Sequence, residues 1–358
     1  MVPPSAPGSP DGVVSAPPPD LERLGNWLER QVPGFARLQG AERLIGGNSN
    51  PIWRLFADSG DYILRTQPAG QLLRSAHALD REARVLTALQ AGAVPVPRLR
   101  VLCNDPGVIG VQFYVMDFVA GEVHRHVGLP ELPRARRAAI HHAAIDMLAT
   151  VHQSPVARLG LADFGRSGNY FERQLHRWTQ QYQAALPEGD AHLDRLIGLL
   201  RKGMPREDHA PVLLHGDARL DNLMFAPGGE RVVAVLDWEL STLGHPLADL
   251  GQYLAVQDLP ADYLLPGLAG CDRQALGIPS QHALATRYLH AMRMDPDTDL
   301  RFYKAFAMFR QAAMSAGLRR RAALGTAVSA SALAFGNTLH VFAQAGLGIL
   351  GCGDAPSP

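Results

Sequence analysis

Apolar and polar residues follow mainly strand-like patterns in the first third of the chain, with two helix-like stretches beside them. From residue 21 to 38 the apolar positions recur at helical spacing, which predicts an amphipathic helix. In RLIGGNSNPIWRLFADSGDYILRTQP, two runs rich in β-branched and aromatic residues flank ADSGD, which predicts an antiparallel hairpin. HALDREARVLTALQAG predicts a helix closed by Gly92, and GVQFYVMDFVAG predicts a strand that ends in a turn.

Helical patterns dominate beyond about residue 120. RRAAIHHAAIDMLATVHQ keeps its branched residues on one face, and helices resume from about residue 246 to residue 350. The exception is PVLLHGDARLDNLMFAPGGERVVAVLDWE, in which apolar runs at 223–225 and 232–236 flank the turn APGGE. This segment predicts a second hairpin, and the whole pattern predicts an α+β fold.

The composition narrows the class of protein. Of the 358 residues 47% are apolar, which is enough to bury one large core or two smaller cores that share a cleft. The 34 acidic and 34 basic residues balance, so no overall basic field attracts nucleic acid or an anionic membrane. Cys103, Cys271 and Cys352 are odd in number and far apart, which indicates neither a disulfide framework nor a zinc site.

The first residues, MVPPSAPGSPDGVVSAPPPD, are rich in Pro, Ser, Gly and Ala. Such a composition buries too little apolar surface to become ordered, so residues 1–19 are predicted to form a disordered tail. The segment lacks a basic leader and an apolar core, and no later run reaches the roughly 18 apolar residues of a membrane span. We therefore expect a soluble, cytoplasmic protein without a nucleic-acid or membrane partner.

The second hairpin concentrates polar residues between apolar runs, in LLHGDARLDNLMF. If the hairpin closes at its two glycines, residues whose numbers sum to about 457 lie opposite each other, which puts Asp237 across from Leu220 and diagonal to Asn222. Diagonal residues lie about 7–8 Å apart, so the oxygens of Asn222 and Asp237 would reach one hard cation. Because Mg²⁺ keeps positions for water and phosphate, the pair predicts a site for magnesium and a nucleotide.

Asp217 lies five residues before Asn222, on the loop that leads into this hairpin. Its carboxylate would accept a proton from a substrate hydroxyl while the metal holds the phosphates.

The residues HGDARLDN, followed by LDWE, resemble the aminoglycoside phosphotransferase and choline kinase superfamily, whose members are relatives of protein kinases. The resemblance implies a bilobal protein-kinase-like fold. A small antiparallel-sheet N-lobe would span residues 20–118, and a larger, mainly helical C-lobe would span residues 119–358.

The resemblance also implies roles for the polar residues of the second hairpin. Asp217 would be the catalytic base, and Arg219 would contact the transferred phosphate. Asn222 and Asp237 would bind Mg²⁺, with help from Glu239. The implied cofactors are ATP and Mg²⁺, and the implied partner is a small molecule with a hydroxyl acceptor.

Two further residues are implied to brace the catalytic loop. His215 would orient the loop, and Asp249 in HPLADLG would accept its backbone N–H groups.

In the first half of the chain, GGNSNPIWRL looks like the nucleotide loop of the superfamily. Its glycines permit the backbone conformations in which successive N–H groups cradle an anion. The expected loop residues are Gly46, Gly47, Asn48, Ser49 and Asn50.

YILR and DREARVL look like the phosphate-binding strand of the superfamily and the helix that faces it. Arg65 stands where a lysine is commoner, and its planar head would fork to a phosphate and to Glu82. VMDFVAG looks like the hinge between the lobes, where the backbone of Met116, Asp117 and Phe118 would bind adenine.

The acceptor is the least constrained part of the prediction. NYFERQLHRWTQQY places Tyr170, Arg173 and Trp178 at helical spacing, which indicates either lobe packing or an acceptor site, and Arg310 leaves the same choice open. His141, His142 and His152 are interpreted as packing or surface histidines.

LRTQPAG, SAHALDRE and DWELSTLGHPLADL resemble the subgroup of the superfamily that also occurs fused to acyl-CoA dehydrogenases, which implies a hydroxyacyl-CoA thioester as acceptor. An aminoglycoside or choline-like acceptor is the alternative within the superfamily. Two other classes stay open: a regulatory pseudokinase that binds nucleotide, and a metal-dependent hydrolase that uses His215, Asp217, Asp237 and His245.

Overall fold

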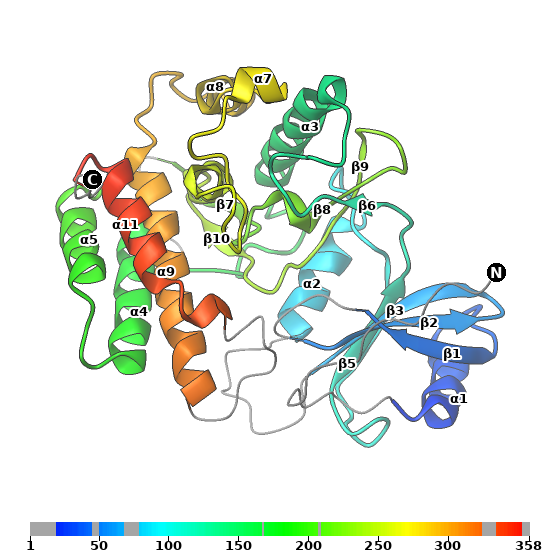
Figure 1. The fold of residues 1–358 in the computed structure, drawn as a ribbon. Helices are drawn as coiled ribbons and strands as arrows, with labels where there is room; N and C mark the ends of the chain where they lie inside the picture. Colours follow the sequence, from blue (N-terminus) through cyan, green and yellow to red (C-terminus); the bar gives the residue numbers. More distant parts are fainter. Residues whose placement is uncertain are drawn as a thin grey trace, which may run out of the picture.

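The computed structural model describes residues 19–44, 50–67, 79–166, 168–206, 209–323 and 334–352. Figure 1 shows a twisted sheet beside a larger helical part, with α2 (Leu79–Leu89) between them. The predicted α+β fold, with an antiparallel sheet in the first part of the chain and a mainly helical second part, is therefore confirmed. The predicted N-terminal tail lies almost wholly outside the described ranges.

The sheet is antiparallel throughout and has the order β1-β2-β3-β5-β4. Its strands are β1 (Leu38–Arg43), β2 (Ile52–Ala57), β3 (Gly60–Thr66), β4 (Leu99–Cys103) and β5 (Phe113–Asp117). The predicted hairpin is present as β2 and β3, and the strand predicted from GVQFYVMDFVAG is present as β5. β1 and β4 carry no clean alternation of buried and exposed residues, which explains why the pattern did not indicate them.

The first helix is shorter than predicted. α1 (Leu21–Gln31) begins where the Asp20 carboxylate accepts the N–H of Arg23 at 3.0 Å. It does not continue to residue 38, because Pro33 lacks an N–H to extend the helix and Gly34 takes a positive φ of 81°. The chain then turns back, and Leu38 pairs with Ala57 in the sheet.

Successive side chains of a strand point to opposite faces, so each face of this sheet has its own environment. One face packs on α1 and includes Trp53, Leu55, Leu64 and Val115 in a separate small core. On the other face, Arg65 pairs across the sheet with Ile52 and Tyr114, next to α2. The alternation therefore directs Arg65 towards the helical part of the molecule.

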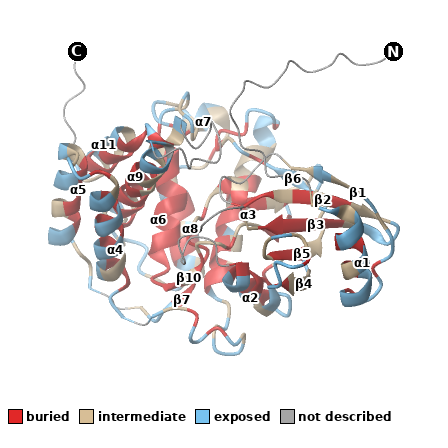
Figure 2. Ribbon diagram, turned by 90° about the horizontal axis from the view of Figure 1, so that it is seen from below, coloured by how far each residue is buried: buried red, intermediate tan, exposed pale blue. Residues whose placement is uncertain are grey.

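The helical part contains one large core. Its longest helix, α9, packs against α4, α6 and α11, and Figure 2 shows α6 as a buried helix in the middle. The helices are α3 (Arg134–His152), α4 (Tyr170–Ala185), α5 (Ala191–Lys202), α6 (Leu247–Ala255), α7 (Arg273–Leu276), α8 (Gln281–Ala291), α9 (Arg301–Ala323) and α11 (Leu339–Ile349). None of the helices within the described ranges is both long and apolar enough to cross a membrane.

Two small sheets hold the polar segment of the second hairpin. β7 (Val212–Leu214) pairs with β10 (Thr242–Gly244), and β8 (Leu223–Phe225) lies between β6 (Glu122–Val123) and β9 (Val232–Val235). Short 3₁₀ turns occur at Leu220–Asn222 and Val256–Asp258.

The predicted register of the second hairpin agrees with the pairing of Phe225 with Val232 and is off by one residue beyond that pair. A bulge between Met224 and Phe225 shifts the pairing, so the Leu236 N–H bonds to the Asn222 carbonyl at 2.9 Å. Asn222 is therefore opposite Leu236, and Asp237 follows immediately after the paired residue. The hairpin itself and its turn after Ala226 agree with the prediction.

Candidate active site

A loop between β7 and β8 carries the histidine, aspartate and asparagine that the sequence singles out. The loop turns sharply at Gly216, whose φ is +84°. A Cβ at this position would lie 2.2 Å from the carbonyl oxygen of Leu240, so only glycine fits. Asp217 and Asn222 follow on the same loop, which leads from β7 in one small sheet to β8 in the other.

Asp249 holds the base of this catalytic loop from α6. It is fully buried, and its two carboxylate oxygens accept the N–H groups of His215 at 2.7 Å and Gly216 at 3.0 Å. His152 on α3 lies 3.2 Å from Asp249 through Nε2, and its Nδ1 contacts the Tyr288 hydroxyl. Burial alone would raise the pKa of Asp249, but these hydrogen bonds lower it below the ordinary value.

His152 is buried, as expected of a packing histidine, and it also belongs to this hydrogen-bond network. Its side chain is buried, and both ring nitrogens have polar partners on other elements. The helical pattern already put residue 152 near the apolar face of α3. A buried imidazole on that face needs partners, but the sequence does not say which residues supply them.

His215 ties the catalytic loop to the strand that precedes Asp237. Its Nε2 donates to the carbonyl oxygen of Leu236 at 2.7 Å, and its Nδ1 accepts the N–H of Asp217 at 3.3 Å. These partners require the neutral tautomer with the proton on Nε2. The ring also packs on Trp238, with ring centroids 4.9 Å apart.

The side chain of Asp217 is held from two sides. The Nδ2 group of Asn222 donates to the Asp217 carbonyl oxygen at 2.8 Å and to Oδ2 at 3.2 Å. Arg219 places Nε 3.4 Å from the same Oδ2 and pairs with Asp221 at 3.0 Å. Burial would lower the pKa of Arg219, but Asp217 and Asp221 raise it above its ordinary value, so the guanidinium stays charged.

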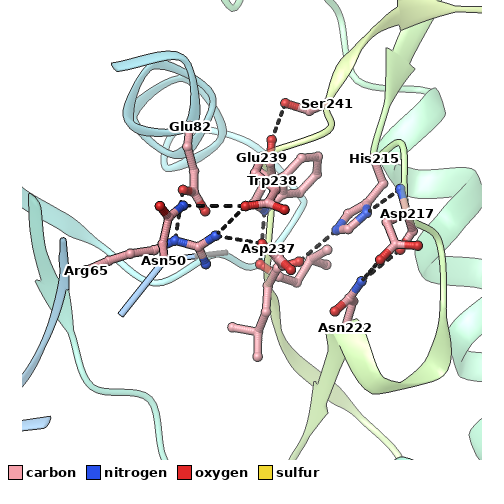
Figure 3. A network of polar contacts seen from close by, with 12 residues as sticks. Asn50, Arg65, Glu82, His215, Asp217, Asn222, Asp237, Trp238, Glu239 and Ser241 are labelled. Carbon is pink, nitrogen blue, oxygen red and sulfur yellow. Dashed lines mark hydrogen bonds and ion pairs between the residues drawn. The ribbon is translucent and has the colours of Figure 1, made fainter. Parts of the chain in front are cut away.

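Asp237 stands between the catalytic loop and the five-stranded sheet, as Figure 3 shows. Its φ of +62° is in the left-handed region, which aspartate tolerates better than most residues. The next residue, Trp238, is buried, and its indole N–H donates to the Val235 carbonyl oxygen at 3.1 Å. The buried tryptophan anchors a strained turn that presents the carboxylates of Asp237 and Glu239.

Arg65 joins the sheet to these carboxylates. Its Nη2 lies 2.9 Å from Asp237 and 3.1 Å from Glu239, and its Nε lies 3.2 Å from Glu82. The Nδ2 group of Asn50 also contacts Glu239, at 3.4 Å. Burial alone would lower the pKa of Arg65, but these three carboxylates raise it well above the ordinary value. A charged guanidinium is thus held at the centre of the site.

Most of the predicted nucleotide loop lies outside the described residues, namely Gly46, Gly47, Asn48 and Ser49. Asn50 is described, and its side chain is buried beside Glu239. Arg65, Glu82 and the pair Asp237 and Glu239 come from three separate stretches of the sequence, and the fold brings them together (Figure 3).

The hinge contacts differ in part from the prediction. The N–H of Asp117 donates to the Arg98 carbonyl oxygen at 2.9 Å, and the N–H of Phe118 donates to the Asp61 carbonyl oxygen at 3.2 Å. Met116 pairs with both neighbouring strands. These two N–H groups complete the sheet, so the prediction of an adenine contact stands only for the carbonyl groups of this stretch.

The structure places the candidate acceptor residues mainly in the core. Tyr170 is buried, which raises its pKa to about 12, and its ring packs on Phe171. Trp178 and Arg310 are also buried, and Arg173 donates to the carbonyl oxygen of Arg166 at 2.8 Å. This placement favours lobe packing, the alternative that the sequence left open.

The donor atoms of the site fit a hard divalent cation. Asn222 uses Nδ2 to hold Asp217, which leaves its amide oxygen for a cation, and Asp237 and Glu239 offer carboxylate oxygens nearby. Within the described ranges, no three His, Cys, Asp or Glu side chains gather closely enough to hold a metal by themselves. Any cation here needs further oxygen ligands, which the phosphates of a nucleotide would supply.

The geometry argues against the hydrolase alternative. Backbone groups occupy both ring nitrogens of His215, so neither has a free lone pair for a metal. The Nδ1 of His245 accepts the N–H of Leu247 at 3.3 Å, and its ring stacks on Tyr303.

Replacing Asp249 by Asn should destabilise the protein by about 3 kcal/mol at pH 7, because one amide N–H would face a backbone donor inside the core. A carboxylate with a lowered pKa stabilises the fold above the ordinary aspartate pKa of about 3.9 and loses this contribution as the pH falls through its folded-state pKa. Urea unfolding should therefore show a constant difference in the free energy of unfolding between variant and wild type from about pH 7 to 5, and a smaller difference below about pH 4.

The control is Asp146→Asn, which makes the same change at an exposed ion pair. Equal stability of Asp249→Asn and wild type would contradict the bracing role.

Comparison with known proteins gives a consistent picture. Residues 40–277 match the family model described as the phosphotransferase enzyme family. A crystal structure from Ralstonia eutropha, named as a candidate aminoglycoside phosphotransferase, is 38% identical with a TM-score of 0.82, and the match covers 94% of this chain and 100% of that one. The GDP complex of aminoglycoside 2'-phosphotransferase-IIIa is 17% identical with a TM-score of 0.60, over 92% of this chain and 99% of that one, which shows the fold alone.

The curated relatives are much longer proteins. Mouse acyl-CoA dehydrogenase family member 11 is 36% identical over 333 residues, which is 92% of this chain and 43% of that protein. Mouse acyl-CoA dehydrogenase family member 10 is 39% identical over 299 residues, which is 83% of this chain and 28% of that protein. The chain thus spans less than half the length of the curated relatives it matches.

Proposed function

Because the chain belongs to the phosphotransferase enzyme family, we propose that it transfers the γ-phosphoryl group of ATP to a hydroxyl of a small molecule, with Mg²⁺ as the metal. The observation that carries this proposal is the convergence of Asp217, Asn222, Asp237 and Arg65 in one cluster (Figure 3). Related folds have been solved with ATP, ADP and GDP, which supports the use of a nucleotide.

In this proposal Asn222 and Asp237 hold Mg²⁺, with Glu239 close by. A bound Mg²⁺ neutralises charge on the phosphates. The Nη2 group of Arg65 contacts Asp237 and Glu239, and its Nε contacts Glu82. When a nucleotide binds, Nη2 can donate to a phosphate oxygen instead, while Nε keeps the ion pair with Glu82.

Asp217 accepts the proton of the acceptor hydroxyl. The Asn222 amide and the Arg219 guanidinium both approach its Oδ2 and thereby orient the carboxylate. Arg219 also puts positive charge beside the point where the phosphoryl group arrives. All these groups are present and connected, which ranks an active enzyme above a pseudokinase.

Arg65→Met should weaken the binding of Mg-ATP by about 10- to 100-fold, the equivalent of about 1.4–2.7 kcal/mol, because three carboxylates lose their common cation. Arg65→Lys keeps the charge but loses the planar fork, so we expect an intermediate affinity. Titration calorimetry would measure both, with Arg84→Met at an exposed ion pair as the control. Tight binding by the folded Arg65→Met variant would remove Arg65 from the nucleotide site.

For the acceptor we propose a hydroxyacyl-CoA thioester. The support is the resemblance to the subgroup associated with acyl-CoA dehydrogenases, together with the names of the curated relatives. An aminoglycoside is the alternative that the solved structures raise, since streptomycin and hygromycin B are bound by two of the related proteins.

The test is a measurement of ADP release with Mg-ATP and a panel of hydroxyacyl-CoA thioesters, choline-like alcohols and aminoglycosides. The proposed function predicts release that depends on one acceptor class, with a phosphorylated product visible by mass spectrometry. Release with an aminoglycoside alone would overturn the acceptor but keep the phosphotransferase. Nucleotide binding without turnover of any acceptor would favour the pseudokinase.

A further inference from the structure

A buried arginine on α9 contacts the back of the catalytic loop. Arg310 is 5% exposed, and its Nη2 donates to the carbonyl oxygen of Gly216 at 2.7 Å. The guanidinium lies 5.8 Å from the centre of the Trp178 ring. Of the carboxylates in the part of the chain that the structure describes, none forms an ion pair with Arg310.

Such a residue is costly for the stability of the fold. Burying a cation without an anionic partner is strongly unfavourable, and a hydrogen bond to a neutral carbonyl recovers only part of the lost solvation. The contact of the guanidinium with the Trp178 ring recovers a further part, but a methionine or leucine would pack against the same ring without the cost of burying a charge. Stability alone therefore does not explain an arginine here, and its one hydrogen bond indicates another role.

The carbonyl that Arg310 holds belongs to the peptide group joining Gly216 to Asp217. The N–H of Gly216 goes to Asp249, and the N–H of Asp217 goes to His215. Arg310 adds the contact to the carbonyl oxygen. With it, every polar backbone group from the N–H of Gly216 to the N–H of Asp217 has a partner.

Gly216 makes this contact necessary. The close approach to Leu240 excludes any side chain at residue 216, yet glycine is the residue with the greatest backbone freedom. A glycine directly before the catalytic aspartate cannot fix the orientation of the following peptide by its own sterics. Hydrogen bonds from other residues must fix the orientation of this peptide group. A planar guanidinium that is packed rigidly in the core can donate such a hydrogen bond in a constant direction.

We propose that Arg310 is a positioning residue that sets the orientation of Asp217 through the Gly216 carbonyl. This inference rests on the proposed function, in which Asp217 is the base. It replaces the acceptor role considered for Arg310 from the sequence. Because a displacement of about 1 Å at a catalytic group can cost about 100-fold in rate, a small reorientation of Asp217 should be visible in turnover.

The first experiment compares Arg310→Met and Arg310→Lys in steady-state kinetics. Arg310→Met should lower kcat by about 10- to 100-fold with little change in the KM values of nucleotide and acceptor. Arg310→Lys should recover part of this loss, because an ammonium group can also donate to the carbonyl. Arg137→Met is the control, since Arg137 donates to the carbonyls of Leu132 and Leu276, neither of which is in the catalytic loop. A higher KM for the acceptor with unchanged kcat would overturn the proposal in favour of acceptor binding.

A double-mutant cycle separates positioning from general damage. If Arg310 acts through Asp217, adding Arg310→Met to Asp217→Asn should cause almost no further loss of rate. Additive losses would overturn the proposal, because they would show that Arg310 acts independently of the base. Arg310→Lys serves in the same cycle if the methionine variant does not fold.

A measurement without turnover distinguishes this inference from the proposed function. Hydrogen exchange of peptides that cover residues 213–222 should be faster in Arg310→Met than in wild type, and unchanged in Arg137→Met. Unchanged exchange in this loop would overturn the positioning role even in an active enzyme. Faster exchange in a protein that turns over no acceptor would support the role and place the failure with the proposed function.

Discussion

Asp217→Asn is expected to lower the rate of phosphoryl transfer by about 10²- to 10⁴-fold while leaving nucleotide affinity nearly unchanged. The amide has the size of the carboxylate and can still accept a hydrogen bond from Asn222, so the loop keeps its shape. It cannot take a proton from the acceptor hydroxyl. The loss should therefore appear in kcat, as expected for a group that acts in the transition state.

Rapid-quench kinetics with Mg-ATP and the acceptor identified in the panel would measure this loss. Asp163→Asn is the matched control, because it makes the same chemical change at an exposed carboxylate that pairs with Arg84. Calorimetry would check that Asp217→Asn still binds the nucleotide. A variant with wild-type turnover would refute the assignment of Asp217 as the base and leave only a structural role for the residue.

Asp237→Asn should lower kcat/KM by about 10²- to 10³-fold at low Mg²⁺ concentration, with partial recovery as the concentration rises. Asparagine tolerates the positive φ of residue 237, so the substitution removes a charge without adding backbone strain. It would remove one anionic ligand from the proposed metal site, to which Asn222 would contribute only a neutral oxygen. The weaker metal site should then limit the reaction.

A titration of activity against Mg²⁺ would show this change as a shift of the midpoint. Glu230→Gln is a suitable control, since Glu230 lies in the turn of the same hairpin and pairs with Arg136. If Asp237→Asn has the Mg²⁺ dependence of the wild type, Asp237 is not a metal ligand. The role of Asp237 in the site would then be its ion pair with Arg65.

Several contacts of the site belong to the backbone, and this affects how such variants are interpreted. His215 and Asp249 hold the loop through N–H and carbonyl groups, so their substitution should disturb stability and activity together. Asp217 and Asp237 expose part of their carboxylates, and substitutions there should affect activity more than stability. Measuring both quantities for each variant separates the two groups.

The sequence by itself determined the local features of the site. Two apolar runs on either side of the turn APGGE predicted the second hairpin, and the interval between Asp217 and Asn222 placed both residues on one loop. The same signals led to the family, which the comparisons confirm. Such features could be predicted because hydrophobic periodicity and turn residues act over short distances along the chain.

Tertiary structure alone decided the register of the hairpin and the partners of the site. A bulge shifted the pairing by one residue, because β9 takes up an extra residue at Val233, and the two apolar runs in the sequence do not record its place. The bond from Arg310 to Gly216 spans 94 positions and the ion pair from Arg65 to Asp237 spans 172. Contacts at such separations depend on how whole helices and sheets pack, and no short pattern in the sequence records that packing.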